Sequence, residues 1–317
     1  MAERDNEGGS QVEPLHSQPE RSDRRIWQQT SRYGFLLVLS IFWGLAFVAI
    51  RSVVTELSPV NLALLRWLVA SVGFLILVPF IGKPKTKFER GDLPRLLVIA
   101  LLNVPVYHLA LNFAETTVSS GLAGLLSSLG PVFIAVLSAC FLKERLSGRL
   151  VFALFLGIAG AIVLSLPNLD FGSSGSIVGP LEVVLAMLSF AVFSVLSKPL
   201  VHKYSSVSVT IWAGLAGTVM LLPLLSWGFV SEVAGLSLTG WVSVLYLSLL
   251  STVVGYLLFY TLVSRGAVSK LSIQLYLIPV VSVVGGVLLL QESLGAHIFA
   301  GGAILLLSVA LATMNRK

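Results

Sequence analysis

Charge is scarce in this chain of 317 residues. Charged residues make up 11% of the sequence, against about 25% in an ordinary soluble domain. Hydrophobic residues make up 56%, and the mean hydropathy is +0.93. So little polar surface cannot cover a water-soluble globule of this size. The composition therefore excludes a soluble globular domain and predicts an all-α integral membrane protein, in which apolar helices of about 20 residues cross the lipid bilayer.

Other absences exclude further classes of function. The single cysteine, Cys140, lies in an apolar run and excludes a disulfide framework and a cysteine-based metal site. The four histidines are scattered, so we expect no metal ion and no cofactor. No G-x-x-x-x-G-K-[ST] motif occurs, which argues against an ATP-driven pump. The net charge of +6 is attributed to basic cytoplasmic loops and not to a nucleic-acid partner.

Ten apolar runs predict ten transmembrane helices. We expect them at about 33–50, 59–81, 94–112, 119–142, 149–166, 179–198, 206–227, 240–263, 268–290 and 295–314. Residues 1–32 contain no apolar run and are expected to form a disordered cytoplasmic tail. Among the loops, the even-numbered ones hold every lysine and arginine except Arg51, which places both termini in the cytoplasm and the protein in the cell membrane.

One element occurs twice in the chain. PVFIAVLSACFLKERL begins at Pro131 and PVVSVVGGVLLLQESL begins at Pro279, 148 residues later. In each copy a glutamate, Glu144 or Glu292, follows the proline by thirteen residues. The copies lie five spans apart, so they cross the membrane in opposite directions. This pattern predicts two five-helix inverted-topology repeats, at residues 33–166 and 179–314. The two prolines favour kinks and are candidate hinges.

These residues resemble a known family. The resemblance rests on Trp43-Gly44 with Phe47, on LALLRWLVAS around Arg66, on LLSSLGPVFIAVLSACFLKERLSG, and on GYLLFYTLVSRGAVSKLSIQLYLIPVVSVVGGVLLLQESLG. Together they are similar to the EamA-type branch of the drug/metabolite transporter superfamily. The resemblance covers about residues 33–314 and implies a ten-helix transporter with a substrate pathway between the two halves.

Polar and aromatic side chains within the spans are candidates for the solute pathway, because they are costly in hydrocarbon. The candidates are Trp43, Arg66, Asn103, Tyr107, His108, Asn112, Tyr256, Tyr260, Gln274 and Tyr276. Arg66 has a structural alternative, in which it bonds backbone carbonyls or reaches the outer headgroups. His108 is either a neutral histidine bonded to a neighbouring helix or a proton-coupling residue.

Glu144 and Glu292 each precede the start of another helix. A carboxylate there accepts hydrogen bonds from the free amides of the following helix, so we expect both to be structural caps. A role in carrying protons is the alternative. The sequence shows no other membrane-embedded acid than Glu182, near the end of a span.

The predicted function is secondary transport by alternating access, as an exporter of amino acids or related neutral or zwitterionic solutes. The sequence leaves open whether protons are the coupling ion. One alternative is a phosphorylated-sugar or nucleotide-sugar antiporter of the same superfamily, which would need several cations in its pathway. A remote alternative is an intramembrane transferase, which would need several ionisable groups at one depth.

The charge distribution predicts which loops are accessible from outside the cell. In intact cells, cysteines introduced by Asp170→Cys and Ser231→Cys should react with a membrane-impermeant maleimide, and one introduced by Lys85→Cys should not. Labelling in the reverse pattern would overturn the orientation.

Overall fold

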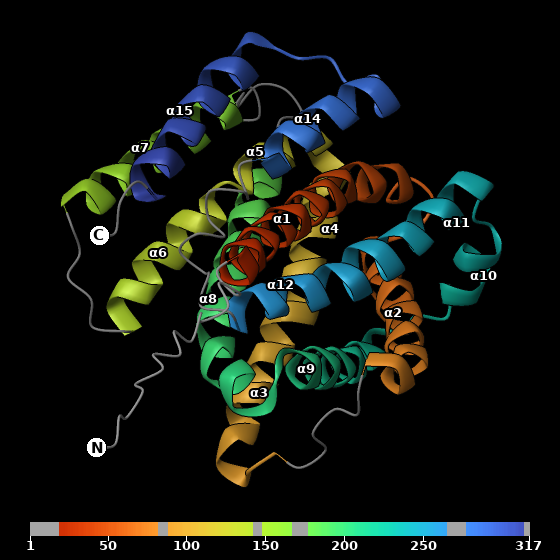
Figure 1. Ribbon diagram of the computed structural model, residues 1–317. Coiled ribbons are helices and arrows are strands. Elements are labelled where there is room, and N and C mark those ends of the chain that lie inside the picture. The colour runs from red at the N-terminus through yellow and green to blue at the C-terminus, as the bar shows by residue number, and fades with distance from the viewer. Residues whose placement is uncertain (1–18, 82–87, 142–147, 167–176, 265–276, 314–317) are drawn as a thin grey trace, which may run out of the picture.

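Helices, most of them apolar, form the framework of the described structure, because a chain in lipid must satisfy its backbone hydrogen bonds within each segment. The computed structural model describes residues 19–81, 88–141, 148–166, 177–264 and 277–313. Within these ranges the regular secondary structure is helical and no strand is present (Figure 1).

The first half of the chain contains α1 (Pro19–Val53), α2 (Pro59–Ile81), η1 (Arg90–Asp92), α3 (Leu93–Leu101), η2 (Leu102–Val106), α4 (Tyr107–Thr117), α5 (Ser120–Leu126), α6 (Leu129–Phe141) and α7 (Gly148–Ser165). The second half contains α8 (Val178–Tyr204), α9 (Ser206–Leu221), η4 (Leu222–Leu224), α10 (Phe229–Ala234), α11 (Leu238–Leu245), η5 (Tyr246–Val254), α12 (Gly255–Ser264), α14 (Leu277–Leu290) and α15 (Ala296–Thr313).

Within the described residues, ten apolar helical segments follow one another in the predicted order. Seven are long and apolar enough to cross a membrane: Gly34–Val53, Pro59–Phe80, Arg90–Thr117, Ser120–Ser138, Val178–Tyr204, Ser206–Leu224 and Leu238–Leu262. Three are shorter: Val151–Leu164, Leu277–Leu290 and Ala296–Ser308. The N-terminal boundary differs from expectation, because α1 begins at Pro19 and residues 19–32 are helical where a disordered tail was predicted. The third span is longer than predicted and runs from Arg90 to Thr117. Residues 1–18 lie outside the described ranges.

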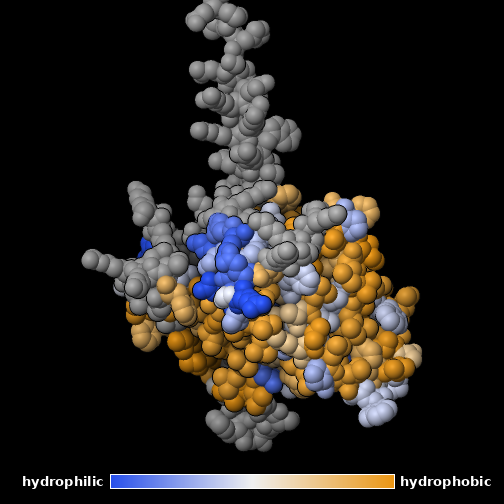
Figure 2. Space-filling view, turned by 90° about the horizontal axis from the view of Figure 1, so that it is seen from below, coloured by the Kyte–Doolittle hydropathy of each residue, from blue (hydrophilic) through white to orange (hydrophobic). Residues whose placement is uncertain are grey.

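The outer surface of the bundle is apolar. Large side chains such as Phe80, Val230 and Leu288 are 80%, 75% and 72% exposed. Figure 2 shows one face of the molecule, on which hydrophobic residues predominate and hydrophilic residues gather in a compact patch. Exposed apolar surface on this scale marks contact with lipid.

Helix α1 lies at the centre of the arrangement (Figure 1). It packs against α4 and α5 of its own half and against α11, η5, α12 and α14 of the other half. Helices α4 and α8 also pack against each other across the halves. The hydrophobic core is therefore built jointly by the two repeats.

Side chains from one repeat bind backbone N–H groups at helix starts in the other repeat, and we call these contacts cross-repeat caps. Amides at a helix start have no partner within their own helix, so each cap satisfies a group that would otherwise be unpaired. The donor and acceptor pairs are Ser58 N to Glu232 Oε2 (2.8 Å), Glu89 N to Tyr204 Oη (2.9 Å), Ser120 N to Glu292 Oε1 (2.7 Å) and Ser237 N to Glu56 Oε2 (2.8 Å).

Two of these caps are related by the inverted repeat. Glu56 and Tyr204 are 148 residues apart, and so are Glu89 and Ser237. Helix α2 separates Glu56 from Glu89, so the two caps lie at opposite ends of the bundle. We name the two ends of the bundle after residues that they carry. The Glu292 end carries Glu56, Ser120 and Glu292, and the Asp92 end carries Glu89, Asp92 and Tyr204.

A second structural correspondence lies inside the spans. The helix of span 3 widens to a π-helix at η2, and that of span 8 widens at η5. In η2 the cause is visible in the sequence, because Pro105 has no N–H to donate to the regular α-helical ladder. Displaced by 148 residues, η2 falls within η5. Such π-helical turns are frequent at functional sites.

Helices α7 and α15 form a pair at the edge of the bundle (Figure 1). Their backbones meet at Gly160 and Gly301. A Cβ added at Gly301 would lie 2.8 Å from the backbone nitrogen of Leu164 and 3.0 Å from the carbonyl oxygen of Gly160. Only glycine permits this approach without moving a helix backbone.

We predict that Gly301→Ala destabilises the protein by about 1–3 kcal/mol, because the extra methyl group meets the backbone of α7. Thermal unfolding of the purified protein in detergent measures this as a lower midpoint. Gly148→Ala is the matched control, because a Cβ at Gly148 would have no neighbour within 4 Å. Equal midpoints for the two variants would contradict the proposed close packing.

Candidate solute pathway

A cavity lies between the two repeats, at the level of the π-helical segments. The cavity and its mouth hold about 620 Å³ of space free of protein atoms. The first repeat lines it through α1, α2, α4, α5 and α6, and the second through α8, η5, α12 and α14. The described lining residues are Trp43, Ala46, Phe47, Ile50, Arg66, Tyr107, Leu111, Ser127, Pro131, Met187, Phe190, Ser251, Tyr256 and Ile278.

Trp43 is at the centre of an aromatic cluster on the cavity wall. Its ring centroid lies 5.7 Å from that of Phe190 in an edge-to-face arrangement, 5.8 Å from that of Tyr256 and 5.3 Å from that of Phe259. Aromatic pairs in such geometries stabilise one another by about 0.5–1.5 kcal/mol beyond the burial of their area. The cluster joins α1 to α8 and α12, so it spans both repeats.

The π-helix η5 fixes the position of the Trp43 indole. The indole Nε1–H donates to the backbone carbonyl of Ser251, at 3.1 Å. The first residue after η5 is Gly255, and a Cβ there would lie 2.7 Å from Nε1. Glycine at this position therefore allows the indole to reach the carbonyl.

Arg66 enters the same wall from α2. It is 3% exposed, and its Nε donates to Thr252 Oγ1 at 2.8 Å while Nη2 donates to Ser251 Oγ at 3.2 Å. These two bonds hold the guanidinium plane against η5. The group has further N–H donors and lines the cavity, so it can bind a carboxylate of a solute by charge-assisted hydrogen bonds.

The predicted pathway residues of span 3 divide between two faces. Tyr107 lines the cavity, whereas His108 is absent from the described lining and packs edge-on against Trp67, with ring centroids 5.3 Å apart. Asn112 donates to the carbonyl of Pro59 at 3.0 Å, which ties α4 to the start of α2. Asn103 is 2% exposed in η2 and is also absent from the lining. The i, i+4 pair of His108 and Asn112 was predicted to line the cavity, but its face packs inside the first repeat.

The remaining predicted residues have varied places. Tyr256 lines the cavity, and Tyr260 lies behind it, fully buried, with ring centroids 6.3 Å apart. Pro131 lines the cavity from α6, and Pro279 is buried in α14 beside the lining residue Ile278. Gln274, Tyr276 and Glu144 lie outside the described residues.

Glu292 caps a different helix from the one predicted. Its carboxylate does not bond the amides that follow it in sequence. It accepts hydrogen bonds from Ser120 N and Gly121 N of α5, at 2.7 and 3.1 Å. Gln291, in the left-handed region with φ of 53°, turns the chain after α14 so that Glu292 reaches across the repeats. The carboxylate then lies at the positive end of the α5 dipole.

A second acid at the same end is a cross-repeat cap as well. Burial alone would raise the pKa of Glu232. The hydrogen bonds that it accepts from the Ser58 amide and from the Asn61 side chain outweigh this effect, so that its pKa lies below the usual value. Glu232 is therefore ionised at neutral pH.

Close helix packing separates the cavity from the Glu292 end. A Cβ at Gly285 of α14 would lie 3.0 Å from the side chain of Val48 of α1, and one at Gly124 of α5 would lie 2.3 Å from Ser282 of α14. The Ser282 hydroxyl donates to the carbonyl of Ser120 at 2.6 Å. These contacts hold α1, α5 and α14 together between the cavity and Glu292.

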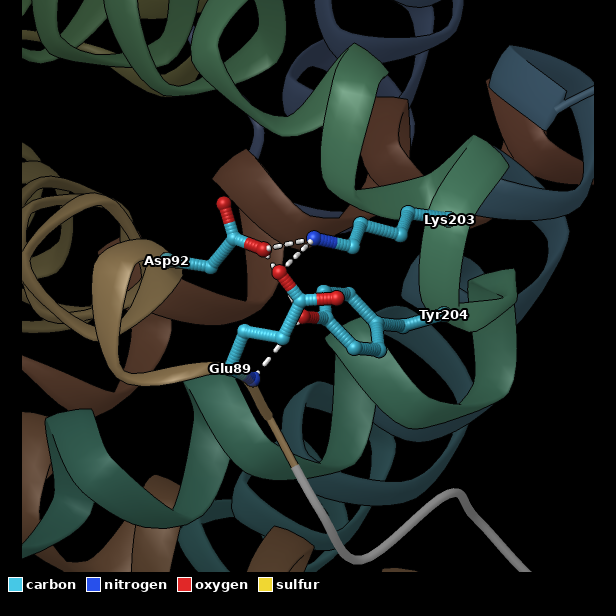
Figure 3. Close-up of polar contacts among 4 residues, drawn as sticks. All are labelled: Glu89, Asp92, Lys203 and Tyr204. Atoms are coloured by element: carbon cyan, nitrogen blue, oxygen red, sulfur yellow. Dashed lines mark hydrogen bonds and ion pairs between the residues drawn. The ribbon is translucent and has the colours of Figure 1, made fainter.

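The Asp92 end is held by a charged cluster (Figure 3). Lys203 Nζ lies 2.7 Å from Asp92 Oδ2 and 2.6 Å from Glu89 Oε2. The Tyr204 hydroxyl donates to Asp92 Oδ2 at 2.7 Å and accepts from the Glu89 amide. The cluster links the start of span 3 to the end of span 6.

Sequence reasoning missed several residues of this site. Phe190, Met187 and Ile278 look like ordinary apolar residues of a span, and no signal in a single sequence distinguishes them. Ser251 and Thr252 were missed although two adjacent hydroxyl residues in an apolar span are a visible signal. Glu115 was missed as well, because no membrane-embedded acid other than Glu182 was identified from the sequence, yet Glu115 is fully buried. Among the described residues, no three histidine, cysteine, aspartate or glutamate side chains come together as metal ligands.

The sequence matches the EamA-like transporter family twice, over residues 31–166 and 177–314. The chain belongs to the EamA-like transporter family. The two matched segments correspond to the two halves that enclose the cavity. This EamA-like transporter is therefore a membrane transport protein, and the cavity between its halves is the candidate solute site.

Curated relatives cover nearly the whole transporter. An uncharacterized transporter of Archaeoglobus fulgidus is 34% identical over 282 residues, which are 89% of this chain and 98% of the relative. A protein of Streptantibioticus cattleyicolor named "Probable terminal-alkyne amino-acid exporter" is 31% identical over 290 residues, 90% of this chain and 94% of the relative. A solved crystal structure with 18% identity has a TM-score of 0.64 and covers 90% of this chain and 98% of its own, which shows a shared fold.

We predict that both replacements of Glu292 lower stability and that Glu292→Ala lowers it more than Glu292→Gln. Alanine removes both amide bonds and should cost about 0.5–2 kcal/mol, as other lost helix caps do. The single amide oxygen of glutamine retains part of the cap. Thermal unfolding in detergent measures the order, with Glu182→Gln as the control. A Glu292→Ala variant as stable as the parent would show that the cap has no structural role.

Proposed function

We propose that this protein is a secondary transporter that exports amino acids or related neutral and zwitterionic solutes by alternating access. The observation that supports this most directly is the position of Arg66, a single buried guanidinium on the wall of a cavity that is otherwise lined by aromatic and apolar residues and two serines. The cavity lies between two inverted repeats, which is where transporters of this architecture bind their solutes.

The chemistry of the wall suits a zwitterion. The free donors of Arg66 can bind a carboxylate, and the faces of Trp43 and Tyr256 can bind an ammonium group by cation–π interaction. Apolar residues such as Met187 and Phe47 leave room for a neutral side chain. The relative named as an exporter of terminal-alkyne amino acids supports the same class of solute.

The alternatives find less support. A phosphorylated sugar or nucleotide sugar needs several cations, and Arg66 is the only basic residue in the described lining. A transferase would need acids or bases that meet at the solute, and the described lining contains no aspartate, glutamate or histidine.

Orientation follows from the loop charges. We place the Asp92 end and both termini in the cytoplasm and the Glu292 end outside the cell, in line with the basic residues of the even-numbered loops. Export then requires the packed contacts of α1, α5 and α14 to separate, so that a solute loaded from the cytoplasm leaves past Glu292.

Transport by reconstituted vesicles tests the proposal. We expect vesicles with the protein to take up neutral amino acids, including one with a terminal alkyne, from a broad metabolite mixture analysed by mass spectrometry. Arg66→Gln should raise KM at least roughly tenfold, because it removes a charge-assisted bond of about 1.5–3 kcal/mol. Trp43→Phe should also raise KM.

Trp227→Phe is the matched control, because Trp227 is fully exposed on the surface. Each variant is compared per folded protein in the vesicle. Uptake of phosphorylated solutes alone, or a KM for neutral amino acids that Arg66→Gln leaves unchanged, would overturn the assignment.

A further inference from the structure

Glu115 is a buried acid that the proposed solute site does not use. It lies in the last turn of α4, at the Glu292 end, one helical turn from the lining residue Leu111. Its side chain is fully buried, and neither carboxylate oxygen has a hydrogen-bond partner among the described residues. By contrast, Glu56, Glu232 and Glu292 at the same end each accept a hydrogen bond from a backbone amide at a helix start.

The charged groups that act on Glu115 make no hydrogen bond to its carboxylate. Arg51 of α1 donates to the backbone carbonyl of Glu115 and not to its carboxylate. Arg66 of α2 is bonded to Ser251 and Thr252, and the Glu292 carboxylate is bonded to the amides of α5. These three groups are the charges that act on Glu115 from the surrounding elements.

An ionised carboxylate in this position would be unstable. Burying an isolated charge without hydrogen bonds costs so much free energy that the group takes up a proton instead. Among the neighbouring charges, Arg51 and Arg66 favour the ionised form and Glu292 disfavours it, but the burial of the unpaired carboxyl group is the largest effect. In this arrangement Glu115 is a neutral carboxylic acid.

We propose that Glu115 is a proton-binding site and that its protonation is required for closure of the Glu292 end. When α1, α5 and α14 separate, water reaches the carboxyl group, which releases its proton to that water as hydronium and remains as carboxylate. Closing the end again requires the carboxylate to take a proton back from water. External pH then sets the balance between the open and closed forms of this end.

The proposal deepens the proposed function, because it supplies a regulator of alternating access, but its test needs no solute. Infrared difference spectroscopy of the purified protein at neutral pH should show a protonated-carboxyl band that shifts in D2O and that Glu115→Gln removes. Glu232→Gln is the matched control, because Glu232 is ionised at the same end. The control should leave the band unchanged.

Accessibility measures the coupling to closure. In a Cys140→Ser background, Val53→Cys introduces a thiol at a fully buried position of the Glu292 end. An exposed thiol introduced at the same end by Leu238→Cys serves as the reference, because maleimide reacts with the thiolate and every thiol labels faster as the pH rises. The labelling rate of the Val53→Cys thiol divided by that of the reference should rise as the pH increases from about 6 to about 9, by up to tenfold per pH unit for one released proton. Adding Glu115→Gln should keep this ratio low at every pH, because the amide is always neutral.

Three results would overturn the proposal: no protonated-carboxyl band in the parent protein, a band that survives Glu115→Gln, or a pH dependence of the labelling ratio that Glu115→Gln leaves intact. Absence of the band in the parent protein would overturn the proposal even if the Glu115→Gln variant does not fold. If amino-acid transport is absent while the band and its loss in Glu115→Gln are observed, only the proposed function fails.

Discussion

Helix starts inside a membrane protein need hydrogen-bond partners that water does not reliably supply, and this chain provides them across its two repeats. Four starts are capped in this way, three in the first repeat and one in the second. The caps fix the ends of the bundle from both sides. The cavity lies between these capped ends, and its position therefore depends on the caps that join the two repeats.

The cavity wall depends on a local departure from α-helical geometry. At η5 the helix widens, and the Ser251 carbonyl accepts the Trp43 indole while its hydroxyl accepts Arg66. One residue of η5 thus orients both the aromatic and the cationic part of the wall. Because this contact joins α1 and α2 to the second repeat, a movement of the repeats would also change the shape of the solute site.

The architecture could be predicted from the sequence because it depends on local patterns. Apolar run lengths give the spans, and the offset of Pro131 and Pro279 gives the inverted repeat. The contacts of Glu292 could not be predicted, because its partner amides are about half a chain away and spacing favours the nearer helix. His108 was misplaced for a different reason: adjacent residues on an α-helix point about 100° apart. Without the rotation of α4, nothing in the sequence distinguishes the face of Tyr107 from that of His108.

The cross-repeat caps also determine the order in which the molecule can be assembled. Ribosomes synthesise α2, η1 and α5 before the residues that cap them, which are Glu232, Tyr204 and Glu292. The first repeat therefore enters the membrane with helix starts that it cannot satisfy by itself. Although both halves match the same family, each half depends on the other for hydrogen bonds to its helix starts. The final packing of the earliest helices waits until the ninth span has been inserted and Glu292 has reached α5.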